Sequence, residues 1–171
     1  MKVAFIDRDG VVNTEVNYLH HERDLKLISS FVDGAKILRK AGFELIIITN
    51  QSGIARGYFT ENEFNRLMSV IRFQLLNHGI SFLDVFYCKH EPKDNCDCRK
   101  PKPGLIQQAL SKYDIDLEQS IMIGDKISDV DAGIKAGVGK NFLVTTGHPF
   151  NMNDVPKNVV VIHKVADIFN V

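Results

Sequence analysis

Two aspartates, Asp7 and Asp9, follow the short apolar run at residues 2–6, with one arginine between them and a glycine after them. Two carboxylates this close repel each other wherever water is excluded, so another group must offset their charge. A third aspartate, Asp125, follows a second apolar run at residues 121–124. Because Mg²⁺ prefers carboxylate, carbonyl and water oxygens, the three aspartates are candidate ligands of one divalent cation.

The elements that must position these residues can be read from the spacing of apolar side chains. Five short apolar runs predict strands buried on both faces of a sheet, at residues 2–6, 45–49, 84–88, 121–124 and 142–145. Helical patterns lie between them, including one that begins at Thr60 with a capping box to Glu63. A last short strand and helix are expected after a loop at residues 147–158. The alternation predicts an α/β fold, a doubly wound and mostly parallel sheet with helices on both faces.

This fold class would bring distant residues together. Asp7, Thr49 and Asp125 each lie at or just after the end of a predicted strand. Ligands of open parallel sheets bind beyond the carboxyl ends of the strands. Taken alone, Asp7 and Asp9 could be an ordinary solvated turn, but polar residues at three strand ends favour a shared site.

Length and composition restrict the class of protein. The chain has 171 residues, 44% hydrophobic and 25% charged, with 21 basic and 21 acidic residues. A balanced charge provides no positive field for nucleic acid or an anionic membrane. No apolar run approaches the roughly 20 residues of a membrane span, and the N-terminal run is too short for a signal peptide. We expect one domain over residues 1–171, a monomer in the cytoplasm, with neither nucleic acid nor membrane as partner.

All three cysteines lie close to one histidine in a single short segment. The four residues are Cys88, His90, Cys96 and Cys98. A Cys₃His set is typical of tetrahedral structural zinc, and four protein ligands leave no open catalytic position. The alternative is a reduced loop with incidental thiols, whereas an odd number of cysteines in a short segment disfavours disulfides. Zinc would order the loop at residues 88–98 and so position Arg99 and Lys100. The remaining histidines are expected at the surface: His20, His21, His78, His148 and His163.

Four segments resemble, in order, the motifs of haloacid dehalogenase (HAD) superfamily phosphatases. They are DRDGVVN (7–13), TN (49–50), CRKPKPG (98–104) and GDKISD (124–129). The resemblance covers nearly the whole chain and implies that Asp7 attacks phosphorus to form an aspartyl-phosphate. It implies that Asp9 protonates the leaving alcohol and then activates water. It also implies that Thr49 and Lys100 contact the phosphoryl oxygens and that Asp125 holds Mg²⁺.

The cysteine-containing loop and the CRKPKPG segment at its end restrict the resemblance to a smaller group within this superfamily. Together with DRDG and TNQSGIARG (49–57), they are similar to the group of histidinol-phosphate and heptose-bisphosphate phosphatases, small enzymes without a separate cap domain. No interval of this chain is long enough for an inserted cap. By this resemblance the substrate contacts would be Glu15, Val16, Asn17, Tyr18, Asn50, Gln51, Ser52, Arg99 and Lys126.

The resemblance leaves two candidate substrates within this group. The segments VNYLHHERDLKLI (16–28) and TNQSGIARGYFTENEF (49–64) favour a phosphorylated sugar, a heptose 1,7-bisphosphate that loses its 7-phosphate. The resemblance implies that the product enters lipopolysaccharide or related glycans. The short spacer between His90 and Cys96 instead resembles histidinol-phosphate phosphatases of histidine biosynthesis. We expect the heptose bisphosphate and keep histidinol phosphate as the alternative.

Two further interpretations belong to other functional classes. The chain could be a binding module that keeps the fold without activity, but such a module has no structural need for both Asp7 and Asp9. It could also be a receiver domain that is phosphorylated at a strand-end aspartate. A receiver is shorter, has no zinc loop and does not place its acceptor at the start of such an aspartate pair.

Overall fold

The computed structural model describes residues 1–170 and contains one six-stranded sheet in which all neighbouring strands are parallel. The strands are β1 (Val3–Ile6), β2 (Glu44–Asn50), β3 (Asp84–Cys88), β4 (Ile121–Gly124), β5 (Lys140–Val144) and β6 (Val159–Ile162). Their order across the sheet is β3-β2-β1-β4-β5-β6, so the winding direction reverses beside β1. The predicted doubly wound α/β fold is confirmed, and the expected strands are present with small shifts at their ends.

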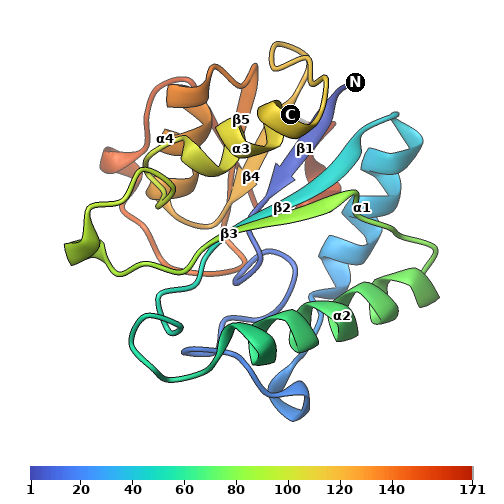
Figure 1. Ribbon diagram of the computed structural model, residues 1–171. Helices are drawn as coiled ribbons and strands as arrows, with labels where there is room; N and C mark the ends of the chain where they lie inside the picture. Colours follow the sequence, from blue (N-terminus) through green and yellow to red (C-terminus); the bar gives the residue numbers. More distant parts are fainter. Residues whose placement is uncertain (171) are drawn as a thin grey trace.

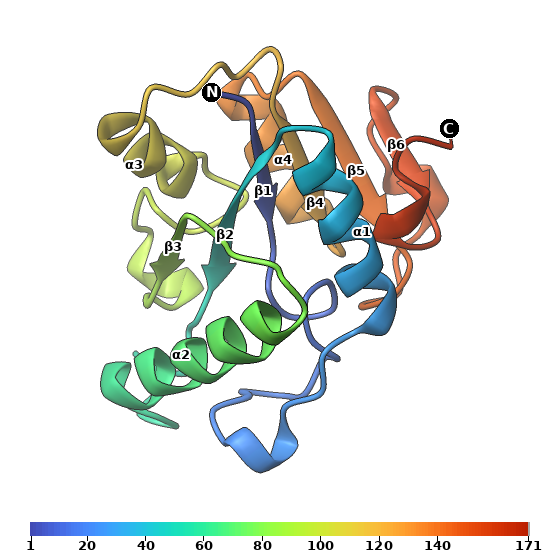
Figure 2. The same ribbon diagram turned by 90° about the vertical axis from the view of Figure 1, so that its right-hand side faces the viewer.

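Four α-helices cover the two faces of the sheet (Figures 1 and 2). Helices α1 (Ser29–Lys40) and α2 (Glu61–Asn77) pack on one face. Helices α3 (Gly104–Lys112) and α4 (Ile127–Ala136) lie on the other. No helix among the described residues is long and apolar enough to span a lipid bilayer.

Local sequence explains where α2 begins and where α4 ends. Thr60 accepts a hydrogen bond from the backbone of Glu63, whose side chain bonds back to Thr60, so the predicted capping box is confirmed. Gly137 ends α4 with a φ of 87°, a left-handed conformation that glycine adopts without strain.

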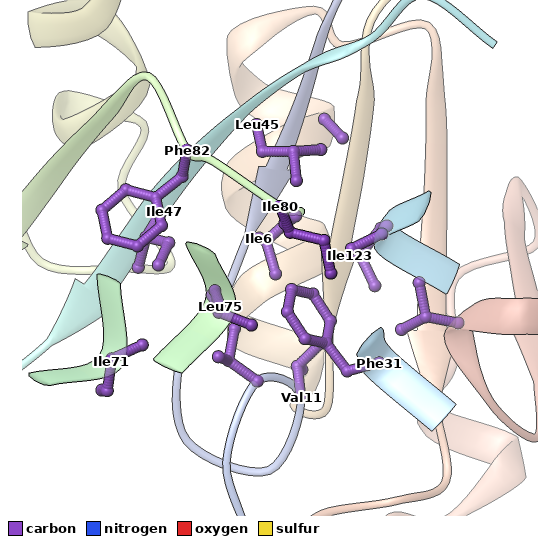
Figure 3. Packing of buried hydrophobic residues seen from close by; sticks show 14 of the residues in the cluster. Ile6, Val11, Phe31, Leu45, Ile47, Ile71, Leu75, Ile80, Phe82 and Ile123 are labelled. Carbon is purple, nitrogen blue, oxygen red and sulfur yellow. The ribbon is translucent and has the colours of Figure 1, made fainter. Parts of the chain in front are cut away.

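Alternate residues of each central strand face opposite layers of helices. Ile6, Leu45 and Ile47 pack toward α1 and α2, as Figure 3 shows. Phe5 and Ile46 point to the other side and join the apolar residues of α3. Both faces are buried, which explains why these strands are continuous apolar runs rather than alternating ones. The sheet thereby becomes a rigid support for the residues at its strand ends.

The last part of the chain differs from the expectation. A single 3₁₀ turn, Val165–Asp167, takes the place of the predicted final helix. Val165 and Ile168 are buried, and Val165 packs so close to Gly34 of α1 that no side chain would fit there. Two buried residues three positions apart need only one turn to pack against the core, so this short element suffices.

Candidate active site

Three neighbouring strands end at one edge of the sheet with polar residues. Asp7 follows β1, Thr49 is the second-to-last residue of β2, and Asp125 follows β4. The backbone N–H of Asp7 donates to the carbonyl of Ile123 at 3.0 Å, so β1 stays paired with β4 up to the carboxylate. These strands flank the reversal of winding, the position where open α/β sheets bind ligands.

A cavity of about 460 Å³ opens at this edge. It is lined by all four residues predicted as catalytic, Asp7, Asp9, Thr49 and Lys100. The nine predicted substrate contacts also line it: the four from Glu15 to Tyr18, the three from Asn50 to Ser52, Arg99 and Lys126. The structure therefore brings together two groups of residues that the sequence analysis assigned to one site.

Lys100 is buried at the base of the cavity between two carboxylates. Its Nζ lies 2.7 Å from Asp7 Oδ1 and 2.7 Å from Asp129 Oδ1, and it donates to the carbonyl of Ile48 at 2.9 Å. Burial lowers the pKa of Lys100, but the charges of Asp129 and Asp7 outweigh burial and raise it above its ordinary value. Burial raises the pKa of Asp7 to about 6, against the opposing effect of the Lys100 charge. The ammonium is therefore a fixed positive charge beside Asp7.

The carboxylates at the strand ends form a site that fits a divalent cation. Asp7, Asp125 and Asp129 each offer an oxygen, and these atoms lie within 4.8 Å of one another. Asp125 is fully buried, and its Oδ1 has no hydrogen-bond partner within residues 1–170. A buried carboxylate oxygen without a partner is costly, and a cation at that atom removes the cost. The oxygen-only donor set suits Mg²⁺.

Asp9, predicted with Asp7 and Asp125 as a ligand of this cation, has its carboxylate outside the cluster of Asp7, Asp125 and Asp129. Its carboxylate accepts hydrogen bonds from Arg8 at 2.8 Å, from Asn13 at 3.0 Å and from Gln51 at 3.0 Å. Burial raises the pKa of Asp9, but the Arg8 charge and these hydrogen bonds hold it below its ordinary value. Five side-chain hydrogen bonds, three of them from Arg8, occupy the carboxylate of Asp9. The part of Asp9 in binding the cation stays a prediction.

The polar residues at the end of β2 are bonded to other parts of the site. Gln51 Nε2 donates to Thr49 Oγ1 at 2.9 Å as well as to Asp9. Asn50 Nδ2 donates to the carbonyl of Lys100 at 3.1 Å. The Thr49 hydroxyl is buried and keeps its own proton to donate to a ligand.

The cysteine and histidine side chains converge at the end of β3. Sulfur–sulfur separations are 3.5 Å for Cys88–Cys96 and for Cys96–Cys98, and His90 Nδ1 lies 3.6 and 3.3 Å from the sulfurs of Cys88 and Cys98. A tetrahedral site with zinc–sulfur bonds of about 2.3 Å needs sulfurs roughly 3.8 Å apart. A disulfide needs about 2.05 Å, so the three cysteines are free. The four donors fit zinc.

Comparisons with known proteins agree with this geometry. A model of the HAD-hydrolase-like family matches residues 97–168. The D-glycero-alpha-D-manno-heptose-1,7-bisphosphate 7-phosphatase of Photorhabdus laumondii is 50% identical over 156 residues, which cover 87% of this chain and 85% of the relative. The chain belongs to the heptose-bisphosphate phosphatase family of HAD-like hydrolases. The D-glycero-beta-D-manno-heptose-1,7-bisphosphate 7-phosphatase of Haemophilus influenzae, another family member, is 44% identical and covers 86% of this chain and 84% of its own.

Solved structures of this family and its neighbours share the fold. The D,D-heptose 1,7-bisphosphate phosphatase from B. bronchiseptica, complexed with magnesium and phosphate, has a TM-score of 0.89 and 30% identity. The match covers 99% of this chain and 97% of that one. A putative HAD-like phosphatase from Mesorhizobium loti has a TM-score of 0.85 and 26% identity, covering 99% of this chain and 83% of that one.

Three residues of the site were missed by the sequence analysis. Asp129 lies in the GDKISD segment, where its position one helical turn after Asp125 was a usable signal. Arg8 stands between the two aspartates and is completely buried. His148 was expected at the surface, but it is only partly exposed and lies 2.6 Å from Asp125. No local pattern marks Arg8 or His148, because the place of each depends on contacts with residues far away in sequence.

Proposed function

We propose that this chain is a magnesium-dependent phosphatase that removes the 7-phosphate from D-glycero-D-manno-heptose 1,7-bisphosphate. The observation that carries the proposal is the arrangement around Asp7, a buried carboxylate with the Lys100 ammonium at 2.7 Å and with Asp125 in the same cluster. This arrangement places a nucleophile, a fixed positive charge and a cation site at the base of one cavity. The named relatives support the heptose substrate and the release of the 7-phosphate.

In the proposed reaction, an Asp7 oxygen attacks phosphorus while the bond from phosphorus to the sugar oxygen breaks. Protonated Asp9 gives its proton to that oxygen, and Lys100 and Thr49 donate to the phosphoryl oxygens as charge builds on them. Water then attacks the aspartyl-phosphate, its proton returns to Asp9, and phosphate leaves with Asp7 restored. The negative charge of the bound phosphate favours the protonated form of Asp9 needed in the first step.

The metals have separate places in this proposal. Asp7 and Asp125 would hold Mg²⁺, which neutralises part of the phosphate charge when bound. Zinc would occupy the closed site of the three cysteines and His90 and serve structure only. The magnesium in the B. bronchiseptica relative supports the first assignment. The donor distances support the second.

The cavity also suggests how the sugar is recognised. Glu15 and Tyr18 are exposed on the loop after β1 and line the cavity, where they can contact sugar hydroxyls. Tyr18 adopts a φ of 56° and packs edge-on against Tyr58, with ring centres 4.5 Å apart. Arg99 lines the same cavity and can bind the second phosphate, because a guanidinium pairs with phosphate through two parallel hydrogen bonds.

We further propose that the chain acts as a single capless domain and as a monomer, in the cytoplasm, with a product used in glycan assembly. Free cysteines arranged for metal binding suit a reducing compartment. Equal numbers of acidic and basic residues give no reason to expect nucleic acid as a partner.

A panel of substrates tests this function. The protein, loaded with Mg²⁺ and zinc, is assayed on the α and β anomers of the heptose 1,7-bisphosphate, on histidinol phosphate and on simple sugar phosphates. We expect the highest kcat/KM on a heptose bisphosphate, with the α anomer preferred because the relative at 50% identity carries that name. Phosphorus NMR should show that the 1-phosphate remains on the product. A higher kcat/KM on histidinol phosphate would show that the heptose assignment is wrong.

A further inference from the structure

The carboxylate of Asp125 is bonded on one oxygen only. Its Oδ2 accepts the backbone N–H of His148 at 2.8 Å and the ring Nδ1 of His148 at 2.6 Å. Its Oδ1 is equally buried but has no hydrogen-bond partner in the part of the chain that the structure describes. One residue, 23 positions away in sequence, therefore decides which oxygen of Asp125 is left free.

The loop that carries His148 is docked tightly against this carboxylate. A Cβ atom on Gly147 would lie 2.1 Å from Asp125 Oδ2, so only glycine lets the backbone come this close. One residue earlier, the hydroxyl of Thr146 donates to the carbonyl of Gly10 at 2.7 Å, in the turn that follows Asp9. The two residues that precede His148 thus fix its position beside Asp125.

We propose that His148 is a positioning residue that holds Asp125 with Oδ1 facing the magnesium site; this rests on the proposed function, in which Asp125 binds Mg²⁺. A ligand carboxylate whose second oxygen is held by a donor keeps one orientation, and loss of such a donor weakens metal binding. The backbone N–H remains whatever side chain is present. The imidazole therefore contributes one of the two bonds.

The ring can be replaced without disturbing the core. The side chain of His148 is 33% exposed and lines the cavity, where its Nδ1 lies 3.9 Å from Glu15 Oε2. Asparagine carries a donor nitrogen at about the position of Nδ1, whereas glutamine carries it one bond further out. The two substitutions therefore differ in how far the donor nitrogen reaches but are similar in polarity.

The test measures the dissociation constant of Mg²⁺ by titration calorimetry, with zinc bound and with no substrate or phosphate present. We expect His148→Ala and His148→Gln to weaken Mg²⁺ binding about ten- to a hundredfold, and His148→Asn to restore most of the affinity. His78→Ala, which removes an exposed histidine just after α2, is the matched control and should bind Mg²⁺ like wild type.

The possible outcomes separate this inference from the proposed function. Wild-type affinity in His148→Ala would overturn the inference and leave the proposed function intact. If His148→Ala does not fold, equal dissociation constants for His148→Asn and His148→Gln would overturn it. Wild-type protein that hydrolyses phosphate esters without binding Mg²⁺ would overturn the proposed cofactor, and the role of His148 with it.

Discussion

Asn50 and Lys100 are joined by a reciprocal pair of hydrogen bonds. Asn50 Nδ2 donates to the carbonyl of Lys100 at 3.1 Å, and the backbone N–H of Lys100 donates to Asn50 Oδ1 at 3.1 Å. The two residues are 50 positions apart, so this pair ties the end of β2 to the segment after the cysteine cluster. It fixes the point from which the Lys100 side chain reaches Asp7.

The first prediction follows from this pair. Asn50→Ala removes two hydrogen bonds of about 1 kcal/mol each, so the Lys100 ammonium loses its fixed position. We expect kcat to fall about tenfold or more while KM changes less, because Lys100 acts mainly on the charge that develops in the transition state. Steady-state kinetics measure the two constants, with Asn77→Ala at the exposed end of α2 as control. A raised KM with unchanged kcat would instead indicate that Asn50 contacts substrate directly.

The second prediction concerns the proposed nucleophile. Asp7→Asn keeps the shape of the side chain but removes the attacking charge, so turnover should fall about a thousandfold or more. The fold should survive because Asp129 still pairs with Lys100 at 2.7 Å. Circular dichroism checks the fold, and calorimetric titration with inorganic phosphate checks that the site still binds. Comparable turnover in the variant would exclude an aspartyl-phosphate on this residue.

Much of the site could be predicted because its residues lie in local patterns. Asp7, Thr49 and Asp125 follow apolar runs that form neighbouring parallel strands, so the fold class alone brings them together. The capping box at Thr60 is equally local. The convergence of the three cysteines and His90 could be predicted because all four lie within residues 88–98.

Long-range contacts explain what could not be predicted. The repulsion between Asp7 and Asp9 suggested one cation between them, but each carboxylate has a basic partner of its own. Lys100 pairs with Asp7, and Arg8 turns inward to pair with Asp9. Burial of an arginine depends on what surrounds it after folding, and neighbouring sequence does not reveal this. The contact of His148 with Asp125 depends likewise on where the loop after β5 lies.

The third prediction tests the buried arginine. The side chain of Arg8 is 1% exposed and that of Asp9 17%, and Arg8 also contacts the carbonyl of Leu19 and the amide of Gln51. Arg8→Met leaves the Asp9 charge without its partner, so we expect the free energy of unfolding to fall by about 3–5 kcal/mol. Urea unfolding of the zinc-loaded protein measures it.

A double-mutant cycle serves as the control for this prediction. The Asp9→Asn variant has no charge at this position to leave unpaired. In that background, Arg8→Met should lower the free energy of unfolding clearly less than in the wild type. If the losses of unfolding free energy in the two single variants add up to that of the double variant, the Arg8–Asp9 pair contributes nothing beyond the packing of the arginine.

The fourth prediction separates the two metals. Mg²⁺ in the proposed site has few protein ligands and should exchange readily, so brief EDTA treatment should stop turnover and added Mg²⁺ should restore it. Zinc in the closed site of Cys88, His90, Cys96 and Cys98 should survive that treatment and contribute to the stability of the loop. Elemental analysis should find close to one zinc per chain. Purified active protein without zinc would contradict the structural assignment.

Arg99 lines the cavity and also contacts the loop that carries the cysteines. Its guanidinium donates to the carbonyl of His90 at 3.3 Å, so the cysteine cluster holds the arginine on the cavity wall. Three residues later, Lys102 has the same charge but points to Asp97 and Asn95 on the outside of the loop. Arg99 and Lys102 therefore allow a comparison between a positive charge that faces the cavity and one that does not.

Arg99→Ala should raise KM for a heptose bisphosphate about ten- to a hundredfold, because a hydrogen-bonded charge pair contributes about 1.5–3 kcal/mol. KM for p-nitrophenyl phosphate, which has no second phosphate, should change little. Lys102→Ala should leave both values close to wild type, since general electrostatic attraction alone is screened at ordinary salt. Steady-state kinetics on the two substrates give the comparison. Equal increases in KM for both substrates would place Arg99 on the phosphate that is cleaved, and the second phosphate would then need another partner.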